Sequence, residues 1–425
     1  MIRILQISDI HWKDKLNALD TFKAIREGMI ADVKRYINQE KKSFDYILIC
    51  GDIAFSGGET QYKRAAKFIK ELCDLTECGT SDVFVVPGNH DKNWKSSPQL
   101  LRELVNKNIA GAKDPDELLA DWLQNDFHTA AMMFTPYRDY EKFAYPYGCA
   151  EPLMHRFNRE KVTAASQYNE DEDRMYWFEE LGEINGYTIK LYGLNSTLYS
   201  DEYDYDDTEK RRNGHKMLLS KLSSTGAKNE DGVVNIMMMH HPMPYFVNGD
   251  SLKTELDKLY HVQLYGHVHV AKSDNENNRI HIFSGALQPD EMGTGQKAYR
   301  PIYNIIELDV ETGAKEDVLK IKLTERYWND STFAEFRRPQ EFEVKLPKYS
   351  WKGDDMETIT KLPEGVTKRD VRLKLINNGR AKSIIAKMDP SFYNKDLSPY
   401  YNIMRFLEKV RVENRWEELW NAMNS

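Results

Sequence analysis

The chain has few cysteines, no long apolar run and no excess of positive charge. Only four of its 425 residues are cysteine, and the spacing of Cys50, Cys73, Cys78 and Cys149 matches no zinc motif, so we expect reduced thiols without a disulfide framework. No uncharged apolar stretch approaches the ~20 residues that span a bilayer. The charged Asp9 comes too early for a secretory signal. We therefore expect a cytoplasmic protein with no membrane partner.

Acidic residues outnumber basic ones, with 67 Asp and Glu against 59 Lys and Arg, and the formal net charge is −8. The chain therefore lacks the basic whole-molecule field that is typical of proteins bound to nucleic acid or anionic lipid. The charge is unevenly placed, because residues 366–425 hold 12 basic and 7 acidic residues, a net of +5, which leaves −13 on residues 1–365. Any nucleic-acid contact is thus expected to be local.

Short apolar runs rich in β-branched residues alternate with helical patterns, as in α/β domains. Six runs that stop at a polar or glycine-containing turn are predicted as buried strands, at residues 2–7, 46–50, 83–86, 188–192, 233–239 and 262–265. Apolar residues at three- and four-residue spacing predict helices over residues 21–38, 59–75 and 215–223. The sequence therefore predicts an α/β fold.

Two stretches interrupt this alternation. Residues 92–174 are rich in helix formers and aromatic residues, which indicates either a helical insertion or cap, or additional core. A polar linker with prolines and glycines at residues 346–365 precedes residues 366–425, which we interpret as a small basic module of two or three short helices. The main domain then covers residues 1–345.

Asp, Asn and His residues follow the predicted strands at the point where each strand ends. Parallel strands deliver their carboxyl ends to one edge of a sheet, where α/β proteins place their sites. Each motif alone is weak evidence, but their joint occurrence after strands favours a functional site over chance. In chain order the residues are Asp9, His11, Asp52, Asn89, His90, Asp91, His240, His241, His267 and His269.

The chemistry of these side chains predicts a pair of divalent metal ions. Carboxylate, amide and imidazole ligands without thiolate suit Mn²⁺, Fe, Zn²⁺ or Ni²⁺. Two ions about 3.5–4 Å apart need one bridging carboxylate, and Asp52 is suited to that position because Gly51 beside it allows close approach. Such a pair generates hydroxide from water and neutralises charge on phosphate oxygens. The pattern therefore predicts phosphoester hydrolysis.

The same motifs resemble those of the calcineurin-like metallophosphoesterase superfamily over approximately residues 1–325. The resemblance implies a metallophosphoesterase αββα sandwich at residues 1–345, with residues 92–174 as a helical insertion and residues 366–425 as a C-terminal helical module. The motifs that carry it are Asp9-x-His11, Gly51-Asp52, Gly88-Asn89-His90-Asp91, His240 and Gly266-His267-x-His269.

The resemblance also implies a role for each motif residue. One metal would be held by Asp9, His11, Asp52 and His269, and the other by Asp52, Asn89, His240 and His267, with Mn²⁺ as the expected ion. His90 would be the catalytic residue that donates a proton or hydrogen bond to the leaving oxygen or the attacked phosphate. Asp91 would orient a neighbouring group.

Two positions leave alternatives open. His240 and His241 compete for one ligand position, and the resemblance favours His240, with His241 lining the pocket. Asn195 follows another predicted strand and is expected at the sheet edge, where structural hydrogen bonding is weighed against contact with substrate. Residues 51–57 and 85–91 resemble a bacterial subgroup found beside small helical adaptor modules, so residues 366–425 are expected to mediate protein association.

The main functional hypothesis is a dinuclear phosphodiesterase that uses a metal-bridging hydroxide, with DNA or RNA as a candidate substrate positioned by the basic C-terminal helices and the insertion. A second hypothesis is a small-molecule phosphodiesterase for cyclic nucleotides, in which aromatic residues of the insertion close over a base. A non-catalytic scaffold and a protein phosphatase are less favoured. The aromatic residues in question are Trp122, Tyr137, Tyr140 and Tyr145.

Overall fold

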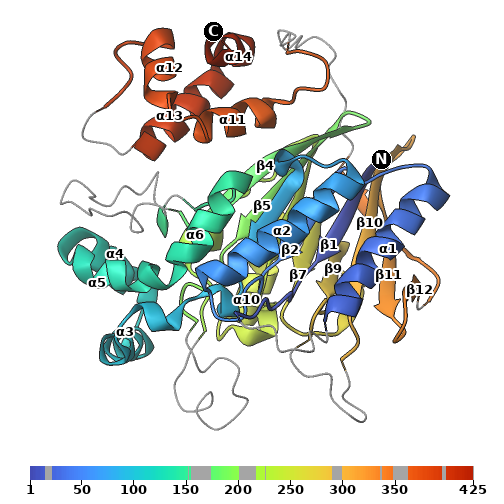
Figure 1. The fold of residues 1–425 in the computed structure, drawn as a ribbon, viewed down its shortest axis with the longest axis horizontal. Helices are drawn as coiled ribbons and strands as arrows, with labels where there is room; N and C mark the ends of the chain where they lie inside the picture. Colours follow the sequence, from blue (N-terminus) through green and yellow to red (C-terminus); the bar gives the residue numbers. More distant parts are fainter. Residues whose placement is uncertain are drawn as a thin grey trace.

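The computed structural model describes residues 1–14, 22–151, 153–154, 174–200, 217–224, 226–289, 299–335, 337–347, 362–394 and 399–424. Residues 155–173 of the predicted insertion, residues 348–361 of the predicted linker and residues 215–216 of a predicted helix lie outside these ranges. Two β-sheets pack against each other between layers of helices, and a further group of helices lies at one end of the molecule (Figure 1).

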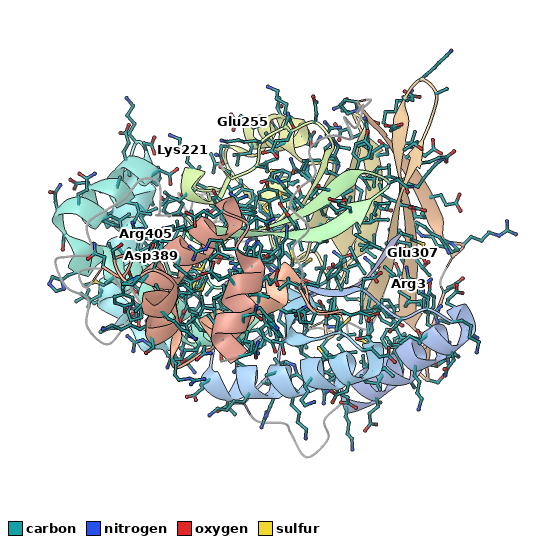
Figure 2. All side chains as sticks on the ribbon, turned by 90° about the horizontal axis from the view of Figure 1, so that it is seen from above. Arg3, Lys221, Glu255, Glu307, Asp389 and Arg405 are labelled. Carbon is teal, nitrogen blue, oxygen red and sulfur yellow. The ribbon has the colours of Figure 1, made fainter. Side chains whose placement is uncertain are left out.

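The first sheet has seven strands in the order β12-β11-β10-β1-β2-β3, with β13 paired to β11. Because β1, β2 and β3 are parallel, their carboxyl ends reach the same edge of the sheet. A buried ion pair between Arg3 and Glu307, 2.7 Å apart, joins the amino end of β1 to β10 (Figure 2). The strands are β1 (Ile2–Ile7), β2 (Tyr46–Cys50), β3 (Val83–Val86), β10 (Ile302–Thr312), β11 (Asp317–Trp328), β12 (Phe333–Glu335) and β13 (Gln340–Leu346).

The second sheet has six strands in the order β4-β5-β6-β7-β9-β8, and β5, β6, β7 and β9 are parallel. Side chains alternate across it, since Ile236 and Met238 of β6 join the main core while Met237 and Met239 pack with α10 (Gly249–Leu259). This sheet therefore buries both faces. Its strands are β4 (Tyr176–Ile184), β5 (Tyr187–Leu194), β6 (Val233–Met239), β7 (Val262–Tyr265), β8 (Ala271–Glu276) and β9 (Arg279–Ser284).

Helices α1 (Lys23–Glu40) and α2 (Glu59–Thr76) lie across the first sheet, and the predicted insertion is helical (Figure 1). Its aromatic side chains join the main hydrophobic core, and Phe143 stacks on Tyr62 of α2 with ring centres 5.0 Å apart. The α/β sandwich predicted from the sequence is confirmed. The insertion helices are α3 (Gln99–Gly111), α4 (Pro115–Asn125), α5 (Phe127–Phe134) and α6 (Arg138–Ala144).

Two parts of the predicted secondary structure differ from the observed one. Of the helix predicted over residues 215–223, only residues 221–223 are helical, as part of α9 (Lys221–Ser224), and the prediction is wrong for residues 217–220, which are irregular. The C-terminal region has four helices where two or three were expected: α11 (Lys368–Ile376), α12 (Ala381–Met388), α13 (Pro399–Val412) and α14 (Trp416–Asn424). No helix in the described ranges is long and apolar enough to cross a membrane.

The four C-terminal helices enclose a small apolar core of their own, which includes Ile385, Phe406 and Leu419. They dock on the main domain through Arg369 of α11, whose side chain is almost fully buried. Its guanidinium donates to the carbonyl of Tyr147 at 2.6 Å, and it also donates to the carbonyl of Ser81. Because Ser81 precedes β3, these helices lie at the amino end of that strand, opposite its carboxyl end (Figure 1).

The Arg369 side chain also neutralises a buried carboxylate. Its Nη1 lies 2.8 Å from Oε1 of Glu179 on β4, and its guanidinium covers the Phe84 ring at 4.1 Å from the ring centre. Arg372 contacts the same carboxylate. The docking therefore combines an ion pair, a cation–π contact and two backbone hydrogen bonds in a buried setting.

Replacing Arg369 by methionine should weaken this docking. The substitution leaves Glu179 buried with one cation fewer, and breaking a buried pair costs about 3 kcal/mol or more. We expect Arg369→Met to lower the midpoint of thermal unfolding and to make helices α11–α14 accessible to limited proteolysis. The control, Arg380→Met at an exposed position, should change neither. Equal midpoints for both variants would contradict a stabilising role for Arg369.

Candidate metal centre

The seven predicted ligands gather where the carboxyl ends of the two sheets meet. Asp9 and His11 follow β1, Asp52 follows β2, and Asn89 follows β3. The other ligands come from the second sheet, with His240 after β6 and His267 and His269 after β7. Four overlapping groups, each with ligand atoms within 4.8 Å of one another, link six of these residues with His90 and His241: Asp9–His11–His269, Asp9–Asp52–His240, His11–Asp52–His90 and His240–His241–His267.

The Asp52 carboxylate lies at the centre of the cluster. Its Oδ2 is 3.2 Å from Nε2 of His11 and 3.2 Å from Nε2 of His240. Its Oδ1 accepts a hydrogen bond from the backbone N–H of His90 at 2.8 Å. The second carboxylate of the cluster is that of Asp9, whose Oδ1 lies 3.1 Å from Nε2 of His269. Asp52 thus contacts groups from both sheets.

Backbone carbonyls fix the orientation of three histidine rings. Nδ1 of His11 lies 3.1 Å from the carbonyl of Gln288, and Nδ1 of His240 lies 2.8 Å from the carbonyl of Cys50. Nδ1 of His90 lies 2.7 Å from the carbonyl of Phe55. Because a carbonyl oxygen only accepts, each Nδ1 carries hydrogen, and the Nε2 lone pair of the neutral ring is left for another partner.

The donor set fits divalent cations. In their neutral form, His11 and His240 each present an Nε2 lone pair to a carboxylate oxygen of Asp52, and two acceptors this close repel unless a cation or a proton lies between them. All the atoms concerned are oxygen or imidazole nitrogen, with no thiolate, which is the ligand chemistry of Mn²⁺, Fe, Zn²⁺ and Ni²⁺.

Five of the seven predicted ligands have a left-handed backbone, which is rare for residues other than glycine. Their φ angles lie between 49° and 69°. Such conformations cost energy and persist where the surrounding structure imposes them, most often at functional sites. Hydrogen bonds between the loops impose them here, since the carbonyl of Asp52 accepts from the N–H of His11 at 3.0 Å. The five residues are Asp9, His11, Asp52, His267 and His269.

Two glycines allow the loops to approach. A Cβ atom at Gly88 would lie 2.1 Å from Oδ1 of Asp52, and a Cβ atom at Gly51 would lie 2.5 Å from Nδ1 of His240. Gly51 also has a φ of 87°. A side chain at either position would therefore displace the carboxylate or the imidazole at the centre of the site.

Burial and charge act in opposite directions on the titratable groups. Burial alone would raise the pKa of Asp9, but the hydrogen bond and charge of His269 outweigh it and bring that pKa to about 2. Burial would likewise raise the pKa of Asp52, and the charges of His240 and His90 lower it overall. Burial lowers the pKa of His267 to about 3, with His240 adding to the effect. The two carboxylates therefore stay ionised in the buried centre.

His240 and Asp91 show the converse shifts. Burial would lower the pKa of His240, but the charge of Asp52 raises it to about 9. Burial and the charge of Asp52 raise the pKa of Asp91 to about 6. Asp91 accepts from the backbone N–H groups of Ala54 and Gly88, both at 2.9 Å, and from Tyr62 Oη at 2.9 Å. It therefore ties the loop after β2 to the loop after β3.

Of the two remaining predicted residues, His241 contacts the predicted ligand Asn89, whereas Asn195 lies in the loop after β5. Nε2 of His241 lies 3.0 Å from Oδ1 of Asn89, and Nδ1 lies 3.1 Å from Oγ of Ser196. Asn195 is buried, accepts from the N–H of Thr197 at 2.8 Å and donates to Oε2 of Glu151 at 2.9 Å. Asn195 thus serves the hydrogen bonding of the loop after β5.

Sequence reasoning missed several groups that position the site. Gln288 holds His11 through its backbone carbonyl, a contact that leaves no side-chain signal in the sequence. Lys92 is buried, and its ammonium donates to the carbonyls of Thr197 and Ser200 at 3.0 and 2.7 Å. Lys92 directly follows the Gly88–Asp91 motif, and its position in the sequence was the one available clue.

Two sequence-based expectations about the substrate are wrong. The rings of Trp122, Tyr137 and Tyr140 are buried in the main core, and Tyr145 donates through Oη to the carbonyl of Ile376, so these residues do not close over the metal ligands. The basic C-terminal helices dock near Ser81, at the amino end of β3, and do not border the ligands at its other end. Most of these aromatic residues of the insertion are therefore part of the hydrophobic core.

Comparison with known proteins places these features in context. A family model described as calcineurin-like phosphoesterase matches residues 2–271. The chain is 30% identical over 107 residues to the 3′,5′-cyclic adenosine monophosphate phosphodiesterase CpdA of Haemophilus influenzae, a match that covers 25% of this chain and 36% of that enzyme. The alignment thus spans about a third of the length of this curated relative.

Solved structures align over about four fifths of the chain at low identity. A predicted phosphoesterase from Streptococcus pneumoniae is 10% identical, with a TM-score of 0.29, over 80% of this chain and 97% of its own. GAP50 of Plasmodium is 11% identical, with a TM-score of 0.39, over 82% of this chain and 90% of its own.

Glu151, the buried partner of Asn195, should make stability depend on pH. Burial raises its pKa to about 8, from an ordinary value of 4.5. The folded protein therefore keeps a proton that the unfolded chain releases, so this group lowers the free energy of unfolding as pH rises from about 4.5 to about 8. Glu151→Gln should remove that loss and gain about 2 to 3 kcal/mol over wild type between pH 5 and pH 7. Denaturant unfolding at several pH values measures this; parallel curves would contradict it.

Proposed function

The chain belongs to the calcineurin-like phosphoesterase family, and from this premise we propose that it is a phosphodiesterase that depends on two divalent metal ions. The observation that carries the proposal is the position of Asp52, whose carboxylate lies between the fixed imidazoles of His11 and His240. A single carboxylate between two sets of ligands is what a dinuclear centre requires.

We assign one ion to Asp9, His11, Asp52 and His269, and the other to Asp52, Asn89, His240 and His267, with Mn²⁺ as the expected metal. His240 is preferred to His241 because its Nδ1 is bound to a carbonyl, whereas Nε2 of His241 lies against Asn89 Oδ1 and carries the hydrogen of that contact. When bound, the ions activate water as a nucleophile and neutralise charge on the phosphate oxygens.

We assign His90 the role of proton or hydrogen-bond donor to the leaving oxygen. One of its ring nitrogens lies within 4.8 Å of ligand atoms of His11 and Asp52, and its side chain is only half-buried. The bond from Nδ1 to the carbonyl of Phe55 fixes the ring, so in the doubly protonated ring Nε2 carries the proton that can pass to substrate. Asp91 accepts a hydrogen bond from the backbone N–H of Gly88 and so holds the loop that carries His90.

Small phosphodiesters are favoured over nucleic acid as substrates. The basic C-terminal helices dock at the amino end of β3, so their charge is not beside the ligands. The rest of the chain carries a net −13, which does not supply the phosphate-tracking surface of a typical nuclease. The relative from Haemophilus influenzae is named a cyclic-nucleotide phosphodiesterase, and we extend that substrate class to this chain.

Two substitutions test the metal centre. Asp52→Asn should abolish Mn²⁺-dependent hydrolysis of bis(p-nitrophenyl) phosphate and reduce bound metal, because the shared ligand loses its charge.

His90→Ala should keep the metal content of wild type and lose turnover by about 10²-fold or more, the usual contribution of a general acid. Metal content by mass spectrometry and kcat by absorbance measure both. A wild-type rate for His90→Ala would overturn its assignment.

Substrate class is tested with the same Mn²⁺-loaded protein. We expect hydrolysis of nucleoside phosphodiesters and cyclic nucleotides, and no shortening of end-labelled single- or double-stranded oligonucleotides beyond the Asp52→Asn background. The reason is that the basic residues of the C-terminal helices do not lie beside the candidate metal ligands. A product ladder that forms with wild type and disappears with Asp52→Asn would instead identify a nuclease.

A further inference from the structure

A pocket of about 400 Å³ lies at the amino ends of the parallel strands of the second sheet. This volume falls within the range of small-molecule sites, about 300–1,000 Å³. The candidate metal ligands follow the carboxyl ends of β6 and β7, so the pocket lies at the opposite edge of the same sheet and is a separate feature. Four residues of its wall mark this edge: Tyr187 of β5, Val233 of β6, His261 just before β7 and Arg279 of β9.

A buried histidine in the wall has one ring nitrogen left for a ligand. His261 is 8% exposed, and its Nδ1 accepts from the backbone N–H of Asn235 at 3.1 Å. The ring hydrogen is therefore on Nε2, which has no hydrogen-bond partner within the described ranges. Burial and the charge of Arg279 lower the pKa of His261 to about 4, so the ring is neutral near pH 7. His261 thus offers one neutral N–H donor.

The guanidinium of Arg279 lies close enough for its charge to act on this ring. Its Nε donates to the carbonyl of Asp257 at 2.5 Å, and its Nη1 donates to the carbonyl of Asn278 at 2.9 Å. These bonds fix the guanidinium and leave Nη2 without a partner in the part of the chain that the structure describes. The Asp257 carboxylate bonds instead to Gln263 and His281. Arg279 is therefore a half-buried cation whose hydrogen bonds go only to backbone carbonyls.

The wall of the pocket is positive on balance. Two of its charged residues pair with residues outside it, Glu230 with Lys190 at 2.8 Å and Lys345 with Glu316 at 3.1 Å. Of the remaining three, two are cations and one is an anion, and none of them forms an ion pair among the described residues. These three are Lys258, Arg279 and Asp231. A net charge of +1 is therefore left for a ligand, which favours an anion.

We propose that this pocket binds a small organic anion through its carboxylate or phosphate group. A guanidinium fork and a neutral imidazole N–H both donate to such oxygens, and bonds to ionised groups are the stronger ones. The pocket is larger than a bare phosphate ion, so the rest of the ligand packs against apolar side chains of the wall, Val233 and Leu346. The inference goes beyond the proposed function and does not depend on it.

The test uses three probes that share a short chain with two hydroxyl groups. Glycerol 3-phosphate carries a phosphate group, glycerate carries a carboxylate, and propane-1,2-diol is uncharged. Titrations followed by ligand-observed NMR are made with the full chain carrying Asp52→Asn and treated with chelator, so that the candidate metal centre does not hold the anions. We expect at least one anion to bind and propane-1,2-diol not to bind, and the tighter anion shows which group the pocket prefers. Equal behaviour of all three probes would overturn the proposal.

Variants of the wall assign the binding to the pocket. Arg279→Gln should weaken binding of the tighter anion at least tenfold. His261→Asn, which keeps an acceptor for the N–H of Asn235 and removes the Nε2 donor, should weaken it several-fold. Lys258→Gln changes an exposed residue of α10 and should also weaken it several-fold with an unchanged circular dichroism spectrum. The control, Arg338→Gln, removes the same charge at an exposed position outside the pocket and should have no effect.

The outcomes for the pocket and for the proposed function are distinguishable. Because every titration is made with Asp52→Asn, in which the proposed hydrolysis is lost, anion binding that depends on Arg279 supports the pocket whether or not wild type hydrolyses diesters. Anion binding that is equal in Arg279→Gln, His261→Asn, Lys258→Gln and Arg338→Gln would overturn the pocket assignment and leave the proposed function unaffected.

Discussion

The contact between Asp52 and the imidazoles of His11 and His240 is the constraint on which the candidate site depends. It joins the carboxyl ends of two different sheets, because His11 and Asp52 follow strands of the first and His240 follows a strand of the second. The surrounding loops accept a left-handed backbone at five ligand positions to reach this geometry. The strained backbone at these positions therefore holds the charged groups in a fixed arrangement.

The electrostatics of the centre explain why it needs a rigid framework. Two carboxylates and several imidazoles are buried together, and hydrogen bonds to the carbonyls of Cys50, Phe55 and Gln288 prevent the rings from turning away. Such a cluster is costly without a counter-charge, which a proton on His240 or a bound cation supplies. Burial of the large apolar core shared by the two sheets stabilises the fold and offsets this cost.

Binding and packing functions are divided between distinct parts of the chain. The insertion supplies buried aromatic residues to the main core, while the C-terminal helices dock through Arg369 at the end of β3 that lies opposite the candidate ligands. Lys92 lies directly after the Gly88–Asp91 motif, and its ammonium binds the carbonyls of the segment after β5. It therefore connects the loop after β3 to the loop after β5.

Five of the six strands predicted from apolar runs, β1, β2, β3, β6 and β7, have the observed bounds, and all the ligand motifs follow these five strands, because buried parallel strands leave a continuous apolar signal. Strands such as β11 were missed because their side chains alternate between buried and exposed positions and include many charged residues. The sequence by itself determined the α/β class and the types and order of the candidate ligands that meet at the sheet edge. Only the tertiary structure decided which carbonyls fix the histidines, where the basic helices dock and which aromatic residues are core, because these depend on contacts between residues far apart in the chain.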